Sequence, residues 1–571
     1  MNDEVQQQAK ELETAEAQGF GSAVKVYAKY SGPGWVQSAI TLGGGSLSGA
    51  LFLGILGGTS LLWLQLIAII MGVIMLSAIS YITLSTGKKP FQAINEHINP
   101  ALGWGWIIAT ITANMLWCMP QFSLCFAALQ KNLVGNSIGD TTGTKVGVSI
   151  VILAIAFFFL KLNESGSKAG KYFDIFLKLL VGGIVLSFFA VVVSLSGSGQ
   201  IQWGAIFKGF IPNPGHWTTP AGDIAILLQA LPQAAQDYWG EAVVKQQRAI
   251  MIGAAATAVG INMTFLLPYN LLSKGWNKSF RGISRFDLCT AMAIPYILAT
   301  SCVVIAASSM FHGKVDEKLA SDDPAVIQTS DNYGAVKDMI LAKAAKVEGT
   351  KTEGITDDEA LALVASTPVE ERKIASSLVK RNAFQLSAAL SPVLGEPKAN
   401  LVFGLGIFGM GFSTIIILML INGYAFCELL GKPQGGQTHL VGCLVAGVCG
   451  AIWPLVWDGP AKLWLAILVS SFGMMLLPIA YSTFFLMMNS NKIMGDEKPK
   501  ESLPIWNILM GISVIGAFIA AGTAVVDKAS NPKAGFVVTI VGVVFALGLA
   551  AYASAPKIRD LEQRIKDLES K

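Results

Sequence analysis

The sequence predicts an all-α polytopic membrane protein. Mean hydropathy is +0.55, 53% of the residues are hydrophobic, and only 14% are charged, compared with about 25% in soluble proteins. The apolar residues gather into runs of about 20, the length that a helix needs to cross a bilayer. These features favour burial of apolar surface in lipid over a series of soluble domains.

The first 30 residues are expected to form a cytoplasmic N-terminal segment. Residues 1–21 are polar and rich in glutamine. They lack the short apolar core and the cleavage site of a signal peptide, so we expect the first apolar run to be retained.

We expect about twelve transmembrane helices, seven within 31–311 and five within 401–554. They cover approximately residues 35–57, 61–84, 104–129, 146–160, 172–195, 249–272, 288–311, 401–430, 440–457, 463–488, 505–526 and 535–553. Lysines and arginines occur in alternate short loops, among them 88–89, 274–285 and 492–500. The positive-inside rule then places both termini in the cytoplasm, and we expect a bacterial-type inner membrane.

The first span contains a predicted break at Gly43, Gly44, Gly45 and Ser46. Each interior glycine weakens a helix by about 1 kcal/mol relative to alanine. Unwound backbone persists in hydrocarbon only where it is buried in protein or lines a cavity. These four residues are therefore candidates for substrate binding, through freed carbonyls and the Ser46 hydroxyl. The alternative is that the glycines only allow close helix packing.

The sixth span contains a second predicted break, because Gly260 and Pro268 bracket a polar segment. Asn262, Met263 and Thr264 are the candidate binding residues there, through an amide oxygen, a weak thioether contact and a hydroxyl. The alternative is a continuous helix whose asparagine bonds a neighbouring helix. Broken helices in corresponding positions of two halves are the usual indication of a transporter site.

Asn114 and Gln121 of the third span are expected to line the same site. For a metal, the candidate ligands are Ser46, Asn262 and Met263. No catalytic residue is expected, because the spans carry no paired histidines, HExxH motif or activated serine, so an enzyme is disfavoured. The net charge of +4 is small and is not gathered in a patch, so nucleic acid is not an expected partner.

Residues 312–400 are expected to form an extracytoplasmic soluble helical insertion. Capping boxes are predicted at Thr356–Glu359 and at Thr367–Glu370, the second with a proline at the first helical position. Residues 555–571 are expected to form a cytoplasmic amphipathic tail with Ile558, Leu561, Ile565 and Leu568 on one stripe. The tail could support a weak oligomer, although two heptads are too short for a coiled coil.

Several motifs occur in the order found in a known family. They are Gly32-Pro33 followed by the break at 43–46, Tyr172–Leu180 with its single Lys178, the glycine- and serine-rich Gly404–Thr414, Leu476–Ala480 and Ile493–Asp496. Together they resemble the natural resistance-associated macrophage protein (Nramp) family of divalent-metal transporters. The resemblance implies a leucine-transporter-type fold, in which spans one to five and six to ten form inverted repeats. It also implies a transported divalent cation and no resident cofactor.

The chain departs from the family at the ion site. The family's Asp-Pro-Gly-Asn motif falls on Gly43–Ser46, and its Met-Pro-His motif is absent. Without a carboxylate–methionine pair, we favour a magnesium-like or other hard divalent cation, moved by alternating access. The first alternative is a sodium-coupled or uncoupled transporter of a small organic solute, and the second is a membrane sensor or structural protein without transport. The other expected partner is membrane lipid.

Overall fold

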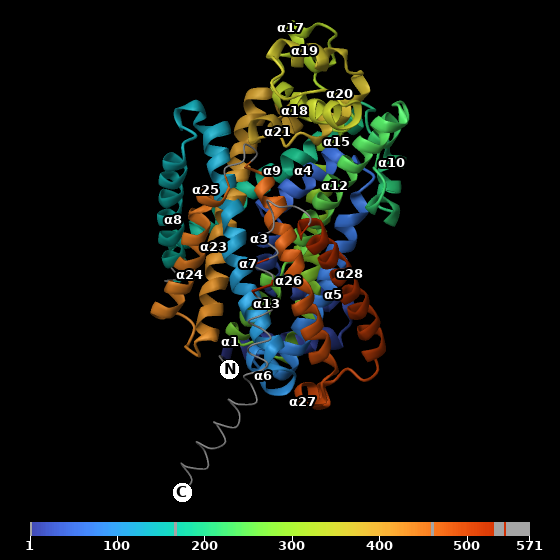
Figure 1. Ribbon diagram of the computed structural model, residues 1–571. Coiled ribbons are helices and arrows are strands. Elements are labelled where there is room, and N and C mark those ends of the chain that lie inside the picture. The colour runs from blue at the N-terminus through green and yellow to red at the C-terminus, as the bar shows by residue number, and fades with distance from the viewer. Residues whose placement is uncertain (1–2, 165–167, 458–461, 530–538, 540–541, 544–571) are drawn as a thin grey trace.

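The computed structural model describes residues 3–164, 168–457, 462–529, 539 and 542–543, and all of the secondary structure in these ranges is helical. Most long helices run along one axis, with the insertion at one end and the N-terminal helices near the other (Figure 1). The tail stripe at 558–568 and, apart from residues 539 and 542–543, the predicted twelfth span lie outside the described residues.

Each of the first eleven predicted spans falls on helix. In the described chain, eight helical segments are long and apolar enough to cross a membrane, and nine if a bent pair counts as one span. The eight segments are Leu62–Thr86, Pro100–Leu133, Thr142–Leu162, Gln233–Ser273, Lys278–Phe311, Glu396–Leu429, Trp464–Asn489 and Leu503–Ala529. The predicted fifth and ninth spans coincide with shorter apolar stretches, Val181–Gly197 and Gly436–Ala451.

The predicted break in the first span is present. Helix α3 (Pro33–Thr41) and helix α4 (Gly44–Gly57) meet at an angle of 49°. Gly43 between them has extended backbone, with φ −76° and ψ 177°. The chain therefore leaves helical geometry only around Leu42 and Gly43.

The predicted break in the sixth span is also present, between α12 (Gln233–Ala258) and α13 (Ile261–Ser273). Val259 and Gly260 are both extended. Pro268 lies inside α13 rather than at the edge of the break. The unwound segment is therefore shorter than the bracketing residues suggested.

Four further long helices surround the two breaks. They are α7 (Pro100–Ala128), α15 (Ile294–Phe311), α23 (Glu396–Leu429) and α26 (Trp464–Asn489). Helix α4 packs against α12 and α15, while α7 packs against α23 and α26. The remaining long helices are α5 (Leu62–Thr86), α8 (Thr142–Glu164), α9 (Lys168–Gly197), α24 (Gly436–Ala451) and α28 (Leu503–Ala529).

A buried carboxylate holds the start of α3. Asp287 ends α14 (Arg281–Asp287) and accepts hydrogen bonds from the amides of Gly32 at 3.1 Å and Gly34 at 2.5 Å, and from the Ser31 hydroxyl. An anion at a helix N-terminus satisfies free amides and complements the helix dipole. A Cβ on Gly34 would lie 2.4 Å from the Asp287 carbonyl oxygen, so this close approach requires glycine.

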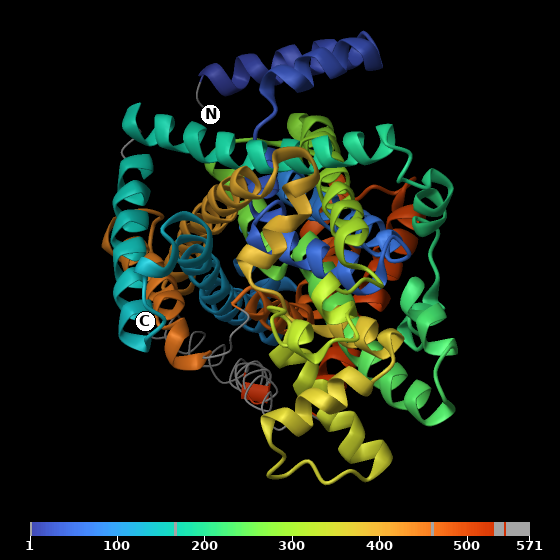
Figure 2. The same cartoon turned by 90° about the horizontal axis from the view of Figure 1, so that it is seen from above.

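The insertion consists of short helices that cover one end of the bundle (Figures 1 and 2). They are α16 (Glu317–Ala320), α17 (Pro324–Ile327), α18 (Tyr333–Lys343), α19 (Asp357–Ser366), α20 (Val369–Leu378), α21 (Ala383–Ser387) and α22 (Ser391–Leu394). The capping box at Thr356 and Glu359 is confirmed. The box predicted at Thr367 is wrong, because Pro368 is the N-cap of α20 and the Thr367 hydroxyl bonds back to Leu363 at 2.8 Å.

The N-terminal helices α1 (Asp3–Ala17) and α2 (Phe20–Tyr30) form a pair at the opposite end. The Lys29 ammonium contacts Glu11 at 2.8 Å, and the Tyr27 hydroxyl donates to Glu16 at 2.5 Å. This pair packs on α14 through α2 and on the turn Lys278–Phe280 through α1.

Candidate functional site

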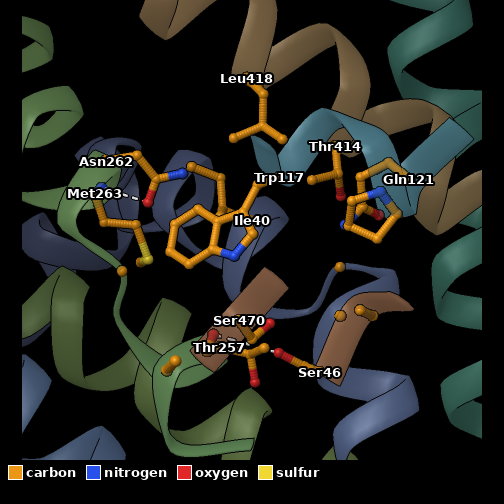
Figure 3. Close-up of a pocket in the computed structure, with 16 residues that line it drawn as sticks. Ile40, Ser46, Trp117, Gln121, Thr257, Asn262, Met263, Thr414, Leu418 and Ser470 are labelled. Carbon is orange, nitrogen blue, oxygen red and sulfur yellow. Dashed lines mark hydrogen bonds between the residues drawn. The ribbon is translucent and has the colours of Figure 1, made fainter. Parts of the chain in front are cut away.

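A cavity of about 40 Å³ lies between the two helix breaks (Figure 3). A buried water needs roughly 10–15 Å³, so the cavity has room for an ion with one or two waters. Its wall comes from both broken helices and from α7, α23 and α26.

Six of the nine predicted site residues line this cavity. They are Gly43, Gly45, Ser46, Gln121, Asn262 and Met263. The two glycine- and polar-rich breaks, more than 200 residues apart in the sequence, are thus brought together with the third predicted span.

The other three predicted residues are buried but do not line the cavity. Gly44 faces α7, where a Cβ would lie 2.5 Å from Leu124 Cδ1. Thr264 donates to the Ile261 carbonyl at 2.5 Å and accepts from the Trp106 indole at 3.0 Å, so its hydroxyl is used in packing. Asn114 is fully buried, and its amide has no hydrogen-bond partner in the described chain.

Hydroxyl groups join the two breaks directly. Ser46 donates to the carbonyl of Thr257, and Thr41 donates to the carbonyl of Ala258, each at 3.3 Å. Thr257 and Ala258 belong to the last turn of α12, whose carbonyls have no partner within the helix. The first turn of α4 and the end of α3 therefore satisfy carbonyls that the second break frees.

Two amide groups in the cavity wall are only partly satisfied. Asn262 Oδ1 accepts from the Met263 amide at 2.9 Å, but Asn262 Nδ2 is buried without a partner among the described residues. Gln121 Oε1 is likewise buried without a hydrogen-bond partner among the described residues. Buried polar atoms are normally hydrogen-bonded, so a polar ligand or its water would supply the missing hydrogen bond at both groups. The Met263 sulfur lies 3.7 Å from the Thr41 hydroxyl, whose single proton it shares with the carbonyl acceptors of Thr41.

Sequence reasoning missed Trp117, whose indole crosses the middle of the cavity between Asn262 and Gln121 (Figure 3). Two glycines make room for the ring. A Cβ on Gly260 would lie 2.2 Å from Trp117 Cη2, and a Cβ on Gly473 would lie 2.2 Å from Cζ2. Trp117 precedes Gln121 by four positions on a helix, and that spacing places both on one face. This signal could have identified it.

Nine further lining residues were also missed. Three carry hydroxyls and the others are apolar or lack a side chain: Thr257, Thr414, Ser470, Gly260, Ile40, Pro120, Ala256, Leu418 and Ala466. The serine and threonine positions carry no distinguishing signal, because many membrane helices use such hydroxyls to bond their own preceding turn. Thr414 does so here, at 2.7 Å from the Met410 carbonyl.

The described cavity wall is electrically neutral. None of its residues is Asp, Glu, His, Cys, Lys or Arg, and no group of three or more potential metal-ligating His, Cys, Asp or Glu occurs in the described ranges. Its polarity comes from hydroxyls, amides and four helix ends. The C-terminal ends of α3 and α12 carry partial negative charge, which favours a cation, whereas the N-terminal ends of α4 and α13 carry the opposite charge.

The sequence matches the profile of the family described as natural resistance-associated macrophage protein-like, over residues 34–344 and 361–525. No protein of curated function matches it. The fold is similar to that of the Eremococcus coleocola manganese transporter. A mutant of that transporter aligns with a TM-score of 0.59 at 14% identity, and its complex with an aromatic bis-isothiourea substituted compound with 0.58 at 15% identity.

Both alignments cover 93% of this chain and 96% of the other. The predicted all-α, leucine-transporter-type architecture is thereby confirmed.

Proposed function

Since this chain belongs to the natural resistance-associated macrophage protein (Nramp) family, we propose that it is a secondary transporter that moves a hard divalent cation, such as Mg²⁺, by alternating access. The observation that carries the proposal is the small cavity at the two helix breaks, whose described wall offers neutral oxygen donors and no carboxylate. The similar fold of a manganese transporter supports divalent cations as the cargo class.

The neutral wall favours an ion that keeps part of its water. Mg²⁺ dehydrates reluctantly and usually retains several waters when bound. Hydroxyl and amide oxygens can accept hydrogen bonds from those waters, and the cavity of about 40 Å³ has room for only a few of them. A soft transition metal would gain most from thiolate or thioether ligands, but the described cavity wall offers only one thioether, Met263, and no thiolate.

The proposed ligands are Ser46 and Asn262, with Gln121 binding a retained water. The carbonyls at the ends of α3 and α12 would add partial negative charge. Met263 would contribute at most a weak contact. No step in this proposal requires an enzyme's catalytic group or a resident cofactor.

A small organic solute is the competing candidate, because the Trp117 ring and the unpaired amides of Asn262 and Gln121 could bind one. A cavity of about 40 Å³ cannot enclose such a molecule without movement of Trp117. The described conformation therefore favours the ion.

We propose that the N-terminal helices lie in the cytoplasm of a bacterial-type cell and the insertion outside it. The lysine- and arginine-rich loops at 88–89, 274–285 and 492–500 support this orientation. Ser366 is exposed on the insertion, so Ser366→Cys should react with a membrane-impermeant thiol reagent added to intact cells. The native cysteines of the unsubstituted protein provide the background, and labelling only after lysis would reverse the topology.

The function is tested by uptake into proteoliposomes of the purified protein. Mg²⁺, Mn²⁺ and small zwitterions are compared under inward and outward gradients, and thermal unfolding with each solute reports binding. We expect uptake and stabilisation with Mg²⁺. Stabilisation by a zwitterion but by no divalent ion would favour the organic-solute alternative. Inactivity of folded protein with every solute would favour a sensor or structural role.

A further inference from the structure

A second, larger cavity lies where the insertion meets the membrane helices. Its volume is about 740 Å³. Its wall is formed by the end of α15, the segment that leads into α16, the segment after α17, helix α21 with the preceding Arg381, and the start of α23.

Arg381 is the buried charged group in this wall. It is 4% exposed, and its Nη2 donates only a long hydrogen bond, 3.3 Å, to the Ser376 hydroxyl. Nη1 is buried without a hydrogen-bond partner among the described residues. The guanidinium carbon lies 4.8 Å from the centre of the Phe311 ring, a cation–π contact that compensates part of the lost hydration.

Such an environment is unfavourable for a cation. A buried charge that is neither paired nor fully hydrogen-bonded is strongly disfavoured, and burial lowers the pKa of Arg381 to about 10. The nearby Asp316 attracts Arg381. However, its carboxylate already accepts from the Ser330 hydroxyl at 2.9 Å and the Leu319 amide at 3.0 Å.

Arg372, another buried arginine of the insertion, differs from Arg381 because hydrogen bonds give it a structural role. Arg372 is 2% exposed and donates to the carbonyls of Leu319 at 2.8 Å and Ser321 at 2.6 Å. It also lies 3.6 Å from an Asp322 oxygen. Arg372 thus holds the loop around α16, whereas Arg381 has no comparable acceptors.

The rest of the wall combines apolar surface with charges of both signs. Phe311 and the 52%-exposed Phe384 provide aromatic surface. Lys314 and Lys318 are the other cations, while Asp316, Glu317, Asp331 and Glu396 are acidic. Glu317, Asp331 and Glu396 are exposed to solvent, so their charges are screened more strongly than that of Arg381.

We propose that this cavity is a binding site for a small organic carboxylate with an apolar or aromatic portion, whose carboxylate pairs with the Arg381 guanidinium. Arg is suited to carboxylates because its planar group can donate two parallel hydrogen bonds. Phe311 and Phe384 would contact the apolar portion. The site is separate from the transport cavity: Glu396 of its wall and Thr414 of the other lie 18 positions apart on α23, roughly 27 Å at 1.5 Å per residue.

The experiment uses the purified full-length protein and radiolabelled benzoate as the probe. Benzyl alcohol, which has the same ring without the charge, and sulfate, an inorganic anion, are the competitors. We expect saturable benzoate binding that neither competitor displaces. Displacement by benzyl alcohol would show that the charge is unimportant, and displacement by sulfate would show an unspecific anion site. Absence of saturable binding would also overturn the proposal.

Variants then assign the site. Arg381→Gln should weaken benzoate binding at least tenfold. Phe384→Asp should also weaken benzoate binding, and because Phe384 is exposed the substitution should not disturb the fold. This variant provides the test if Arg381→Gln does not fold. Asn262→Ala in the transport cavity should bind benzoate like the parent, which separates this proposal from the transport function. Unchanged binding by folded Arg381→Gln or by Phe384→Asp would exclude the site.

Discussion

The indole nitrogen of Trp239 donates a hydrogen bond of 2.8 Å to Glu371 Oε2, which joins α12 of the membrane domain to α20 of the insertion. Both side chains are buried, and the Lys343 ammonium lies 3.3 Å from Glu371 Oε2. The contact thus joins the insertion to α12, whose other end lines the cavity between the two helix breaks.

We expect Glu371→Ala to lower stability by about 3 kcal/mol, because it leaves a buried indole donor and removes one partner of a buried ion pair. Thermal unfolding in detergent should show a lower midpoint. Glu371→Gln keeps an acceptor for Trp239 and should fall between the parent and the alanine variant. Equal midpoints for all three proteins would contradict the proposed importance of this contact.

We expect Asn262→Ala to affect mainly Mg²⁺ binding and Thr264→Val to affect mainly the stability of the fold. Asn262 lines the cavity, and its Oδ1, which accepts only from the Met263 amide, keeps a lone pair for Mg²⁺ or its water. Its loss should therefore weaken Mg²⁺ binding up to about tenfold, the effect of one hydrogen bond, with little change in unfolding temperature. Thr264 bonds Trp106 outside the cavity, so its replacement should lower stability more than binding. Calorimetric titration and thermal unfolding of both variants measure the two effects. Weaker Mg²⁺ binding by Thr264→Val alone would place the site elsewhere.

We expect Gly260→Ala to reduce transport at least tenfold. The added Cβ would lie 2.2 Å from the Trp117 ring, so either the ring or the break must move. Gly240 lies on α12, the helix that precedes the break. A Cβ added there would meet no heavy atom within 4 Å beyond its chain neighbours and the backbone of its own helix. Gly240→Ala is therefore the matched control. It should retain uptake and gain up to about 1 kcal/mol of stability from helix propensity.

Adding Trp117→Ala to Gly260→Ala removes the clashing ring. Better folding of the double variant than of Gly260→Ala would confirm that the clash, rather than backbone strain, is responsible. An uptake rate equal to that of the parent in Gly260→Ala alone would contradict the prediction.

We expect stability to fall with pH below about 6.5, partly through His312. Its Nε2 accepts from the Asp223 amide at 2.8 Å, and its Nδ1 lies 3.1 Å from the Ile55 carbonyl. Burial lowers the pKa of His312, so below the ordinary histidine pKa of about 6.5 the unfolded chain takes up the proton first. Stability is therefore unaffected by this group above that pH and is lost progressively as the pH falls.

Thermal unfolding at pH 7.5 and 5.5 measures this dependence. His312→Gln should reduce it, because glutamine does not titrate. Burial also lowers the pKa of His216, so His216→Gln controls for a second contribution of the same sign. A dependence that neither substitution alters would assign it to carboxylates or to the other two histidines, His97 and His439.

The sequence was sufficient to predict the helical architecture and both breaks, because apolar runs and clustered glycines act locally. It could not separate Gly44 from Gly45, or Thr264 from Asn262. Successive residues at a helix start point in different directions, and which one faces the cavity depends on packing against α7 and Trp106. The four-residue spacing from Gln121 indicates that Trp117 shares its helix face. The position of the ring across the cavity, however, depends on the space at Gly260 and Gly473, which are distant in sequence.

The prediction of a capping box at Thr367 was wrong for a related reason. The short motif is compatible with two neighbouring helices, and the hydroxyl bonds the end of α19 rather than the start of α20. Arg381 likewise gave no signal, since nothing in a sequence distinguishes a paired arginine from an unpaired one.

The hydrogen bonds between Asp287 and the start of α3 determine which parts of the molecule can move independently. Three hydrogen bonds join that carboxylate to residues 31–34, and α14 continues without interruption through a π-helical turn into α15. The first half of the broken helix cannot tilt unless residues 281–311 travel with it or all three bonds are broken. Leu42 and Gly43, the two residues without helical geometry, are consequently the place where α4 can change direction relative to α3 with these three bonds intact.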